Sequence, residues 1–374
     1  MANSELIVRS GQVRALRLFD LAYEIDLKRA EDLWRQRTQG ATTRSRLAGT
    51  PAKAVSFDVP PLALELGPVE LEVGGTGMTA AASVRLYDFG IAAVALRLPA
   101  QNLSWTGFIQ LVNQTDKAIG PAVATAVWDT LLAQLRDLLR EALDRPTAVP
   151  LQEDYLIALV DAFDQPLTAE ELQERAELVP LLSGEDRPLS DGARRDLLGQ
   201  RFSYYSDDLA VITWDRAFIF EPRPETDVAD VLEMANAQLL EIRTYDEMLD
   251  EELPRMRDMV EAARRRLNLL ASRRYARLAR RLYTLVAEVS ELTERVDNAL
   301  QVTEDVYLAR VYGAAMELFR VPNVSAAVDR KLAIIRETYT ALHSEAAGAR
   351  AELLEIAILV LIAVEIILSL TRHG

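Results

Sequence analysis

The sequence has no cysteine and only two histidines among its 374 residues. Without cysteine, the chain cannot form a disulfide, a cysteine-based zinc site or a thiol nucleophile. Both histidines, His343 and His373, lie near the C-terminus, whereas a hydrolase triad or a histidine metal site needs imidazoles that converge. We therefore expect a protein without catalytic residues, without cofactors and without enzymatic activity.

The chain also has little positive charge, with 42 Lys and Arg against 57 Asp and Glu and a net charge of −15. An acidic protein is not a general nucleic-acid binder, because affinity for phosphates comes mainly from Lys and Arg. The N-terminus, "MANSELIVRSGQV", lacks the basic segment and apolar core of a signal peptide. The composition therefore favours a body that stays in the cytoplasm.

Residues 1–224 have the pattern of a mixed α/β domain. Segments such as "LALEL", "VELEV" and "VRLYDFGIAAVALRL" alternate apolar and polar residues, as half-buried antiparallel strands do. Helices are expected after Asp26, over 119–144, and after Thr168, which forms a capping-box pattern with Glu171. The order of elements suggests two copies of a ferredoxin-like β-α-β-β layer, in which "LYDFGIAAVAL" and "YYSDDLAVITW" would be matching strands.

From residue 225 onward, proline and glycine become scarce and apolar residues recur every three or four positions. This spacing predicts long helices that pack on one another as a coiled-coil-like hairpin or bundle. The expected helices cover about 226–252, 256–320 and 323–371, with breaks at Pro254 and Pro322. The overall prediction is an α+β chain with a mixed domain over 1–224, a helical bundle over 225–352 and an apolar helix over 353–371.

A basic stretch over residues 264–281 holds eight arginines and no acidic residue. In one interpretation it contacts RNA, the ribosome or anionic lipid headgroups. In the other, the chain reverses near Pro254 and the basic stretch pairs with the acidic stretch over 241–252. The arginines that would share one helix face are Arg266, Arg273, Arg277 and Arg280.

The segment 353–371 is almost wholly apolar but contains two carboxylates, Glu355 and Glu365. Its 18 residues from Leu353 to Leu370 would span about 27 Å as a helix, just short of a bilayer core of about 30 Å. A central acid costs about 2.5–3.5 kcal/mol on insertion, and the surrounding aliphatic residues offset that cost. We expect either a membrane anchor or the core of a soluble oligomer, built on Ile358, Leu361 and Ile362.

Two features of the sequence resemble a known family. The first feature is Leu354-Glu355 followed by Val364-Glu365-Ile366, and the second is "YDFGIAAVAL" over 87–96. They are similar to segments of the required-for-meiotic-nuclear-division family, which includes the Sad1-interacting factors. The resemblance departs at Ile356, where the family has tryptophan. It implies a membrane-anchored protein that associates with itself, and a mitochondrial relative supports organelle translation. No catalytic residue is implied.

Taken together, the sequence predicts a non-enzymatic scaffold that forms homo-oligomers and is held to the inner (plasma) membrane by its C-terminal helix. Contact with RNA or the ribosome through the arginine-rich stretch is the alternative.

Two motifs that could indicate an enzyme have simpler interpretations. "EVGGTGMTA" lacks the Gly-Lys-Ser/Thr of a P-loop and predicts a hairpin turn. Asp207, Asp208 and Asp215 could bind a divalent ion, but acidic turn residues are the commoner explanation.

Overall fold

The computed structural model of the chain describes residues 5–38, 42–44, 59–123, 125–185, 187–223, 227–264 and 306–372, with single positions between 277 and 290. In the last helix, the side chains of residues 342, 343, 345–357, 360 and 363–372 lie outside this description. The chain divides into two compact units. The sheet unit comprises Met1–Glu241 and Arg295–Pro322, and the helical unit comprises Ile242–Glu294 and Asn323–Gly374.

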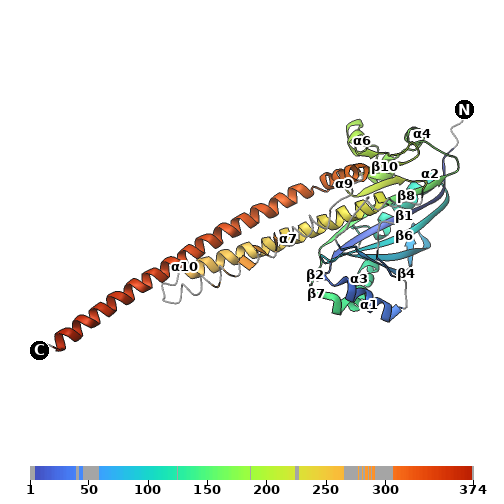
Figure 1. Ribbon diagram of the computed structural model, residues 1–374. Coiled ribbons are helices and arrows are strands. Elements are labelled where there is room, and N and C mark those ends of the chain that lie inside the picture. The colour runs from blue at the N-terminus through green and yellow to red at the C-terminus, as the bar shows by residue number, and fades with distance from the viewer. Residues whose placement is uncertain are drawn as a thin grey trace. The chain divides into compact units, whose positions relative to one another are not determined.

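The sheet unit is built on a nine-stranded sheet within the described part of the chain (Figure 1). Its strands pair antiparallel except for β8 and β11, which are parallel. A separate small sheet pairs β2 (Ala22–Ile25) with β7 (Leu143–Pro146). In spatial order, the strands of the large sheet are β3 (Thr42–Arg44), β4 (Leu62–Val73), β5 (Thr76–Leu86), β6 (Ile91–Ser104), β1 (Ile7–Asp20), β8 (Gln152–Phe163), β11 (Arg216–Phe220), β10 (Leu209–Ile212) and β9 (Arg201–Phe202).

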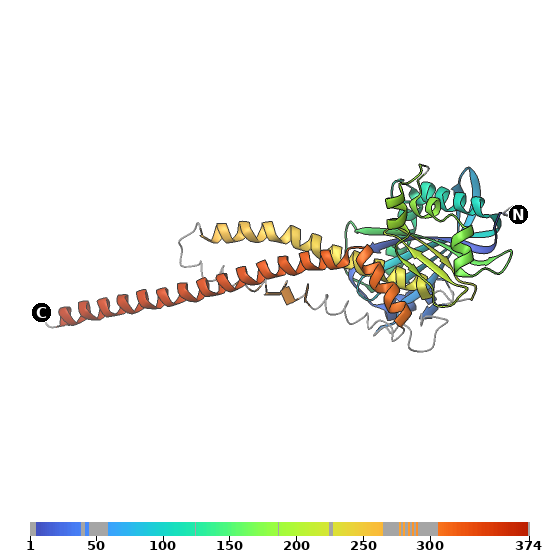
Figure 2. The same cartoon turned by 90° about the horizontal axis from the view of Figure 1, so that it is seen from above.

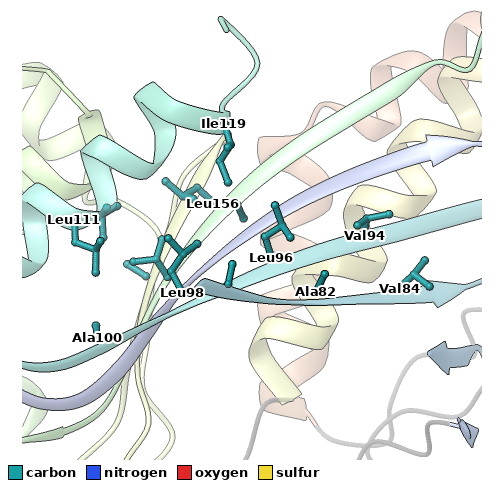
Figure 3. Close-up of a cluster of buried hydrophobic side chains, with 14 of the residues drawn as sticks. Ala82, Val84, Val94, Leu96, Leu98, Ala100, Leu111, Ile119 and Leu156 are labelled. Carbon is teal, nitrogen blue, oxygen red and sulfur yellow. The ribbon is translucent and has the colours of Figure 1, made fainter. Parts of the chain in front are cut away.

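One face of this sheet carries the main hydrophobic core. Because side chains alternate along a strand, Val94, Leu96 and Leu98 of β6 point to the same side and are buried there. Leu111 and Ile119 of α2 (Trp105–Ile119) pack against them, as Figure 3 shows. The other helices of this part of the chain are α1 (Leu27–Thr38), α3 (Ala126–Leu139), the short 3₁₀ turn η1 (Arg140–Ala142), α4 (Ala169–Arg175), α5 (Val179–Ser183) and α6 (Asp191–Leu197).

The opposite face is covered by the first part of α7 (Asp227–Arg264) and by α9 (Val306–Leu318) (Figure 2). Arg85 of β5 forms an ion pair of 3.0 Å with Glu233 of α7. Tyr155 of β8 packs edge-on against Phe319, which directly follows α9, with ring centroids 5.4 Å apart. The compact unit therefore extends past residue 224, where the change in composition places the end of the first domain.

Several local predictions are confirmed. Asp26 accepts a hydrogen bond from the Arg29 amide at the start of α1, and Thr168 and Glu171 form a complete capping box on α4. The "GGTG" segment forms the β4–β5 hairpin, in which Gly74 and Gly75 have positive φ. These signals depend on neighbouring residues alone, which explains why the sequence is sufficient to find them.

Two other predictions of local structure are corrected. The helix expected over 119–144 is shorter: it corresponds to α3, because α2 ends at Ile119 and the chain breaks at Gly120 and Pro121 before α3 begins at Ala126. The segment "VRLYDFGIAAVALRL" is two strands, and Gly90 turns the chain between them with a φ of 95°. A Cβ at Gly90 would lie 1.8 Å from the Ala22 carbonyl oxygen, so only glycine fits there.

The duplicated ferredoxin-like layers are not seen as separate layers. The long strand β1 pairs along most of its length with β6 on one side and with β8 on the other, which joins both halves into one continuous sheet. The two segments expected to match become β6, with 14 residues near the centre, and β10, with 4 residues beside the edge strand.

The helical unit contains the second part of α7 and most of α10 (Val321–Arg372), which run side by side (Figures 1 and 2). The break near Pro322 is confirmed, because α9 ends at Leu318 and Arg320 has a positive φ of 57°. The chain reversal at Pro254 is wrong, since α7 continues through this proline to Arg264. Leu249 and Met256 are buried on either side of Pro254, and this packing holds the helix despite the missing hydrogen bond.

Candidate functional site

The end of α10 carries the apolar residues that the sequence singles out. Ile358, Leu361 and Ile362 lie three and four positions apart, so they share one side of the helix. Together with Leu359 they are between 48% and 68% exposed. Glu355 and Glu365 belong to the same helix, but their side chains lie outside the described residues. The described part of this segment is therefore an apolar helix surface open to its surroundings.

Among the residues whose side chains the structure describes, no helix is both long enough and apolar enough to cross a membrane. Most side chains of the segment 353–371 are outside those residues.

The preceding part of α10 is packed differently. Val328, Leu332 and Ile335 recur at helical spacing and are buried. Beside them, the Lys331 ammonium lies 2.7 Å from Asp246 and 2.7 Å from Asp250 of α7. Burial lowers the pKa of Lys331, but the hydrogen bonds to both carboxylates outweigh this effect and raise the pKa. This part of the helix thus has a protein partner within the helical unit.

The acidic residues over 241–252 of α7 form ion pairs with nearby basic residues of α7 and α10. Asp246 and Asp250 pair with Lys331, while Glu251 and Glu252 lie 3.3 and 2.8 Å from Arg255 on the same helix. These basic partners, Lys331 and Arg255, are outside the basic stretch over 264–281. Of the predicted basic patch, Arg266 and Arg273 lie outside the described residues, whereas Arg277 and Arg280 are helical and exposed.

The carboxylates considered for a divalent ion bind arginines instead. Arg223 contacts Asp207 at 3.1 Å and Asp208 at 3.4 Å, and its guanidinium lies over the Tyr205 ring. Asp215 accepts a hydrogen bond from Thr213 and lies 3.8 Å from Arg216. Within the described residues, no group of three or more carboxylate or histidine side chains is placed to hold a metal.

A buried network of charges that the sequence does not reveal lies between the sheet and α7. Arg85 of β5 contacts Asp230 at 3.1 Å and Glu233 at 3.0 Å. Tyr87 donates a hydrogen bond of 3.1 Å to Glu233, and Arg14 of β1 lies 3.6 Å from Asp230. Burial raises the pKa of Glu233, and the nearby Arg85 guanidinium opposes this rise. The network joins three segments far apart in sequence and fixes the start of α7 on the sheet.

Another buried arginine, Arg216, ties the opposite face of the sheet to its helices. Its guanidinium donates to Asp116 at 2.6 Å, to Asn113 at 2.7 Å and to the Leu181 carbonyl at 3.1 Å. These contacts join β11 to α2 and α5.

The comparisons with known proteins concern the sheet unit. A sequence model of the family described as "Uncharacterized protein MJ0711, N-terminal domain" matches residues 10–227. The chain is similar to the uncharacterized protein MJ0711 of Methanocaldococcus jannaschii, with 24% identity over 201 residues. This alignment covers 54% of the chain and 61% of the relative. No solved structure matches the chain. The resemblance to the required-for-meiotic-nuclear-division family is not confirmed by these matches.

Proposed function

We propose that this chain, which belongs to the family of the MJ0711 N-terminal domain, is a non-enzymatic scaffold anchored to a membrane by the end of α10. The sheet unit would remain in the cytoplasm and present a surface for partners. The observation that carries this proposal is the exposure of Ile358, Leu359, Leu361 and Ile362 on one helix. Aliphatic residues exposed together in water are unfavourable, and they indicate an interaction surface.

The length and composition of the segment favour lipid as the surrounding medium. A helix from Leu353 to Leu370 is about 27 Å long, close to the hydrocarbon thickness of a bilayer. Each Leu, Ile or Val near the centre contributes about 0.3–0.6 kcal/mol to insertion, and most residues between Ile356 and Leu370 are of these types. Their sum offsets the cost of one intramembrane carboxylate.

Removing residues 353–374 should release the protein from membranes. We expect the full chain to pellet with carbonate-washed membranes and to float with vesicles in a density gradient, and the chain ending at Glu352 to stay in the supernatant. A full chain that sediments as a large particle but does not float would instead show that the helix is the core of a soluble oligomer. A truncated chain that still pellets would contradict the anchor.

Self-association is the second part of the proposal. An acidic side chain within a bilayer is costly unless it faces protein or water, and we propose that Glu365 faces a helix of a second copy. Replacing Glu365 with leucine should then change the size of the particle on gel filtration in detergent. Glu355→Leu, at the start of the segment, is the matched control and should leave the elution volume unchanged. An identical profile for Glu365→Leu would refute the interface role.

Contact with RNA or the ribosome is a second candidate, supported by the exposure of Arg277 and Arg280. Replacing both with glutamine should weaken RNA binding at low salt, and the dependence of affinity on salt should fall by roughly 0.7 per lost contact with a single strand. Arg255→Gln is the control, because Arg255 already pairs with two glutamates. Equal RNA retention by all three proteins would exclude this function.

A further inference from the structure

A groove of about 660 Å³ lies on the sheet unit, across four neighbouring strands. Its volume is within the range of about 300–1,000 Å³ that is typical of small-molecule sites. Small residues such as Gly67 and Ala81 leave the space open, and Arg97 provides a positive charge. The complete lining is Gly11, Gln12, Glu65, Gly67, Pro68, Thr79, Ala80, Ala81, Arg97 and Pro99.

The groove is on the same face of the sheet as the buried charge network. Arg97 of β6 lies directly opposite Arg14 of β1 and opposite Ala81 of β5, and side chains of residues directly opposite each other share a face. Gln12, which lines the groove, is two residues from Arg14 on the same strand and therefore also shares this face. The groove thus continues directly from the region where Arg14 meets α7.

This region has two like charges directly opposite each other, an arrangement that is unfavourable unless anions compensate it. Arg14 is 7% exposed, its contact with Asp230 is long at 3.6 Å, and its Nε–H has no hydrogen-bond partner among the residues that the structure describes. Burial lowers the pKa of Arg14, the Asp230 and Glu233 carboxylates oppose this, and Arg85 and Arg97 lower it further. The carboxylates of α7 therefore compensate the positive charge of Arg14 and Arg97 only in part.

Within the described part of the chain, the charged partner of the Arg97 guanidinium is Glu65, which lies at the surface. The Arg97 Nη2 atom lies 2.7 Å from Glu65, and the two side chains are 32% and 64% exposed. Exposed ion pairs of this kind contribute little to stability. A ligand carboxylate or phosphate could therefore replace the Glu65 carboxylate, and would gain two parallel hydrogen bonds from the planar guanidinium fork.

We infer that the groove binds a small molecule carrying a carboxylate or phosphate group, with Arg97 as its principal ligand and the Gln12 amide beside it. When the ligand is absent, the Glu65 carboxylate is bound to the Arg97 guanidinium. This inference concerns the sheet unit alone and does not depend on membrane anchoring.

The test is a calorimetric titration of the full chain with inorganic phosphate and, separately, with succinate. We expect saturable binding to at least one of them. Arg97→Gln should weaken that binding about ten- to a hundredfold, the usual effect of removing a charged hydrogen-bond donor. Glu65→Gln should strengthen it, because the internal competitor loses its charge. The control is Arg9→Gln, an exposed arginine of β1 that bonds to Asn102 at 3.0 Å and does not line the groove.

A second experiment distinguishes a lipid headgroup from a free metabolite as the bound anion. Vesicles of phosphatidylcholine with and without phosphatidic acid are mixed with the full chain and with Arg97→Gln. A preference for phosphatidic acid that Arg97→Gln abolishes would assign the groove to a lipid headgroup, whereas an effect of this variant on the soluble anions alone would assign it to a free metabolite. Thermal melting of each variant without ligand shows that the fold is kept. Binding in neither arm, or binding that Arg97→Gln and Glu65→Gln leave unchanged, overturns the inference.

Discussion

Replacing Arg85 with methionine is expected to lower the free energy of unfolding of the sheet unit by about 3–5 kcal/mol, the usual cost of removing one partner from a buried ion pair. Arg85 contacts both Asp230 and Glu233, whose side chains are 7% and 4% exposed. Methionine fills similar space but leaves two buried carboxylates short of positive charge. Urea unfolding followed by tryptophan fluorescence measures this effect, because all four tryptophans, Trp34, Trp105, Trp128 and Trp214, belong to the sheet unit.

The loss of unfolding free energy in Arg85→Met should become larger as the pH increases. In the native chain, burial raises the pKa of Glu233 and Arg85 opposes the rise, so methionine at residue 85 raises this pKa further. A carboxyl group that binds its proton more tightly in the folded state stabilises the fold at low pH and loses that contribution as the pH increases. The deficit of Arg85→Met relative to the native chain should therefore be smaller at pH 5 than at pH 8.

Two further variants separate the network from general effects of losing an arginine. Arg97→Met removes an ion pair that is partly exposed on the same sheet and should cost only about 0–1 kcal/mol. Combining Arg85→Met with Glu233→Met should recover part of the loss, since an apolar pair is often as stable as a buried ion pair. A cost below 1 kcal/mol for Arg85→Met, or a cost independent of pH, would show that the network does not hold α7 on the sheet.

Local signals explain which parts of the fold can be predicted from the sequence. The capping box of Thr168 and Glu171 and the glycine turn at Gly74 and Gly75 are both found where the pattern places them. Each depends on the chemistry of a few adjacent residues, such as the left-handed backbone that glycine accepts. The α+β class follows from the change in periodicity after residue 224.

The features that the sequence does not reveal depend on contacts between distant segments. In "VRALRLFD", Arg14 and Arg17 are three residues apart, so they lie on opposite faces of β1, and charged side chains are usually exposed. Both arginines are in fact buried, because helices cover both faces of the sheet. Pro254 likewise looks like a break, but the packing of Leu249 and Met256 keeps α7 continuous. Tertiary burial overrides the local pattern in each case.

Some of the candidate functional residues can likewise be found from the sequence, and others cannot. The exposed apolar residues at the end of α10 are in the region that hydropathy alone selects. The buried charge network requires knowing that α7 lies on β1 and β5. One signal was available: Asp227, Asp230 and Glu233 recur every three residues within an otherwise apolar helix start. All three are buried, and acids placed along the buried side of a helix require basic partners elsewhere in the chain.

The second large effect is expected at the centre of the apolar helix end. Leu361 lies near the midpoint of the segment from Leu353 to Leu370 and is 68% exposed. At the centre of a bilayer, lysine costs about 2.5–3.5 kcal/mol and the lost leucine a further 0.3–0.6 kcal/mol or so. Leu361→Lys should therefore reduce the ratio of membrane-bound to free protein by roughly two to three orders of magnitude. Ile334→Lys is the matched control, because Ile334 is also an aliphatic residue of α10, is 50% exposed and lies in the part that packs against α7.

Flotation with vesicles measures both variants. The full chain and Ile334→Lys should float in the lipid fraction, whereas Leu361→Lys should remain below it. Co-flotation of all three proteins would exclude lipid as the medium around this helix.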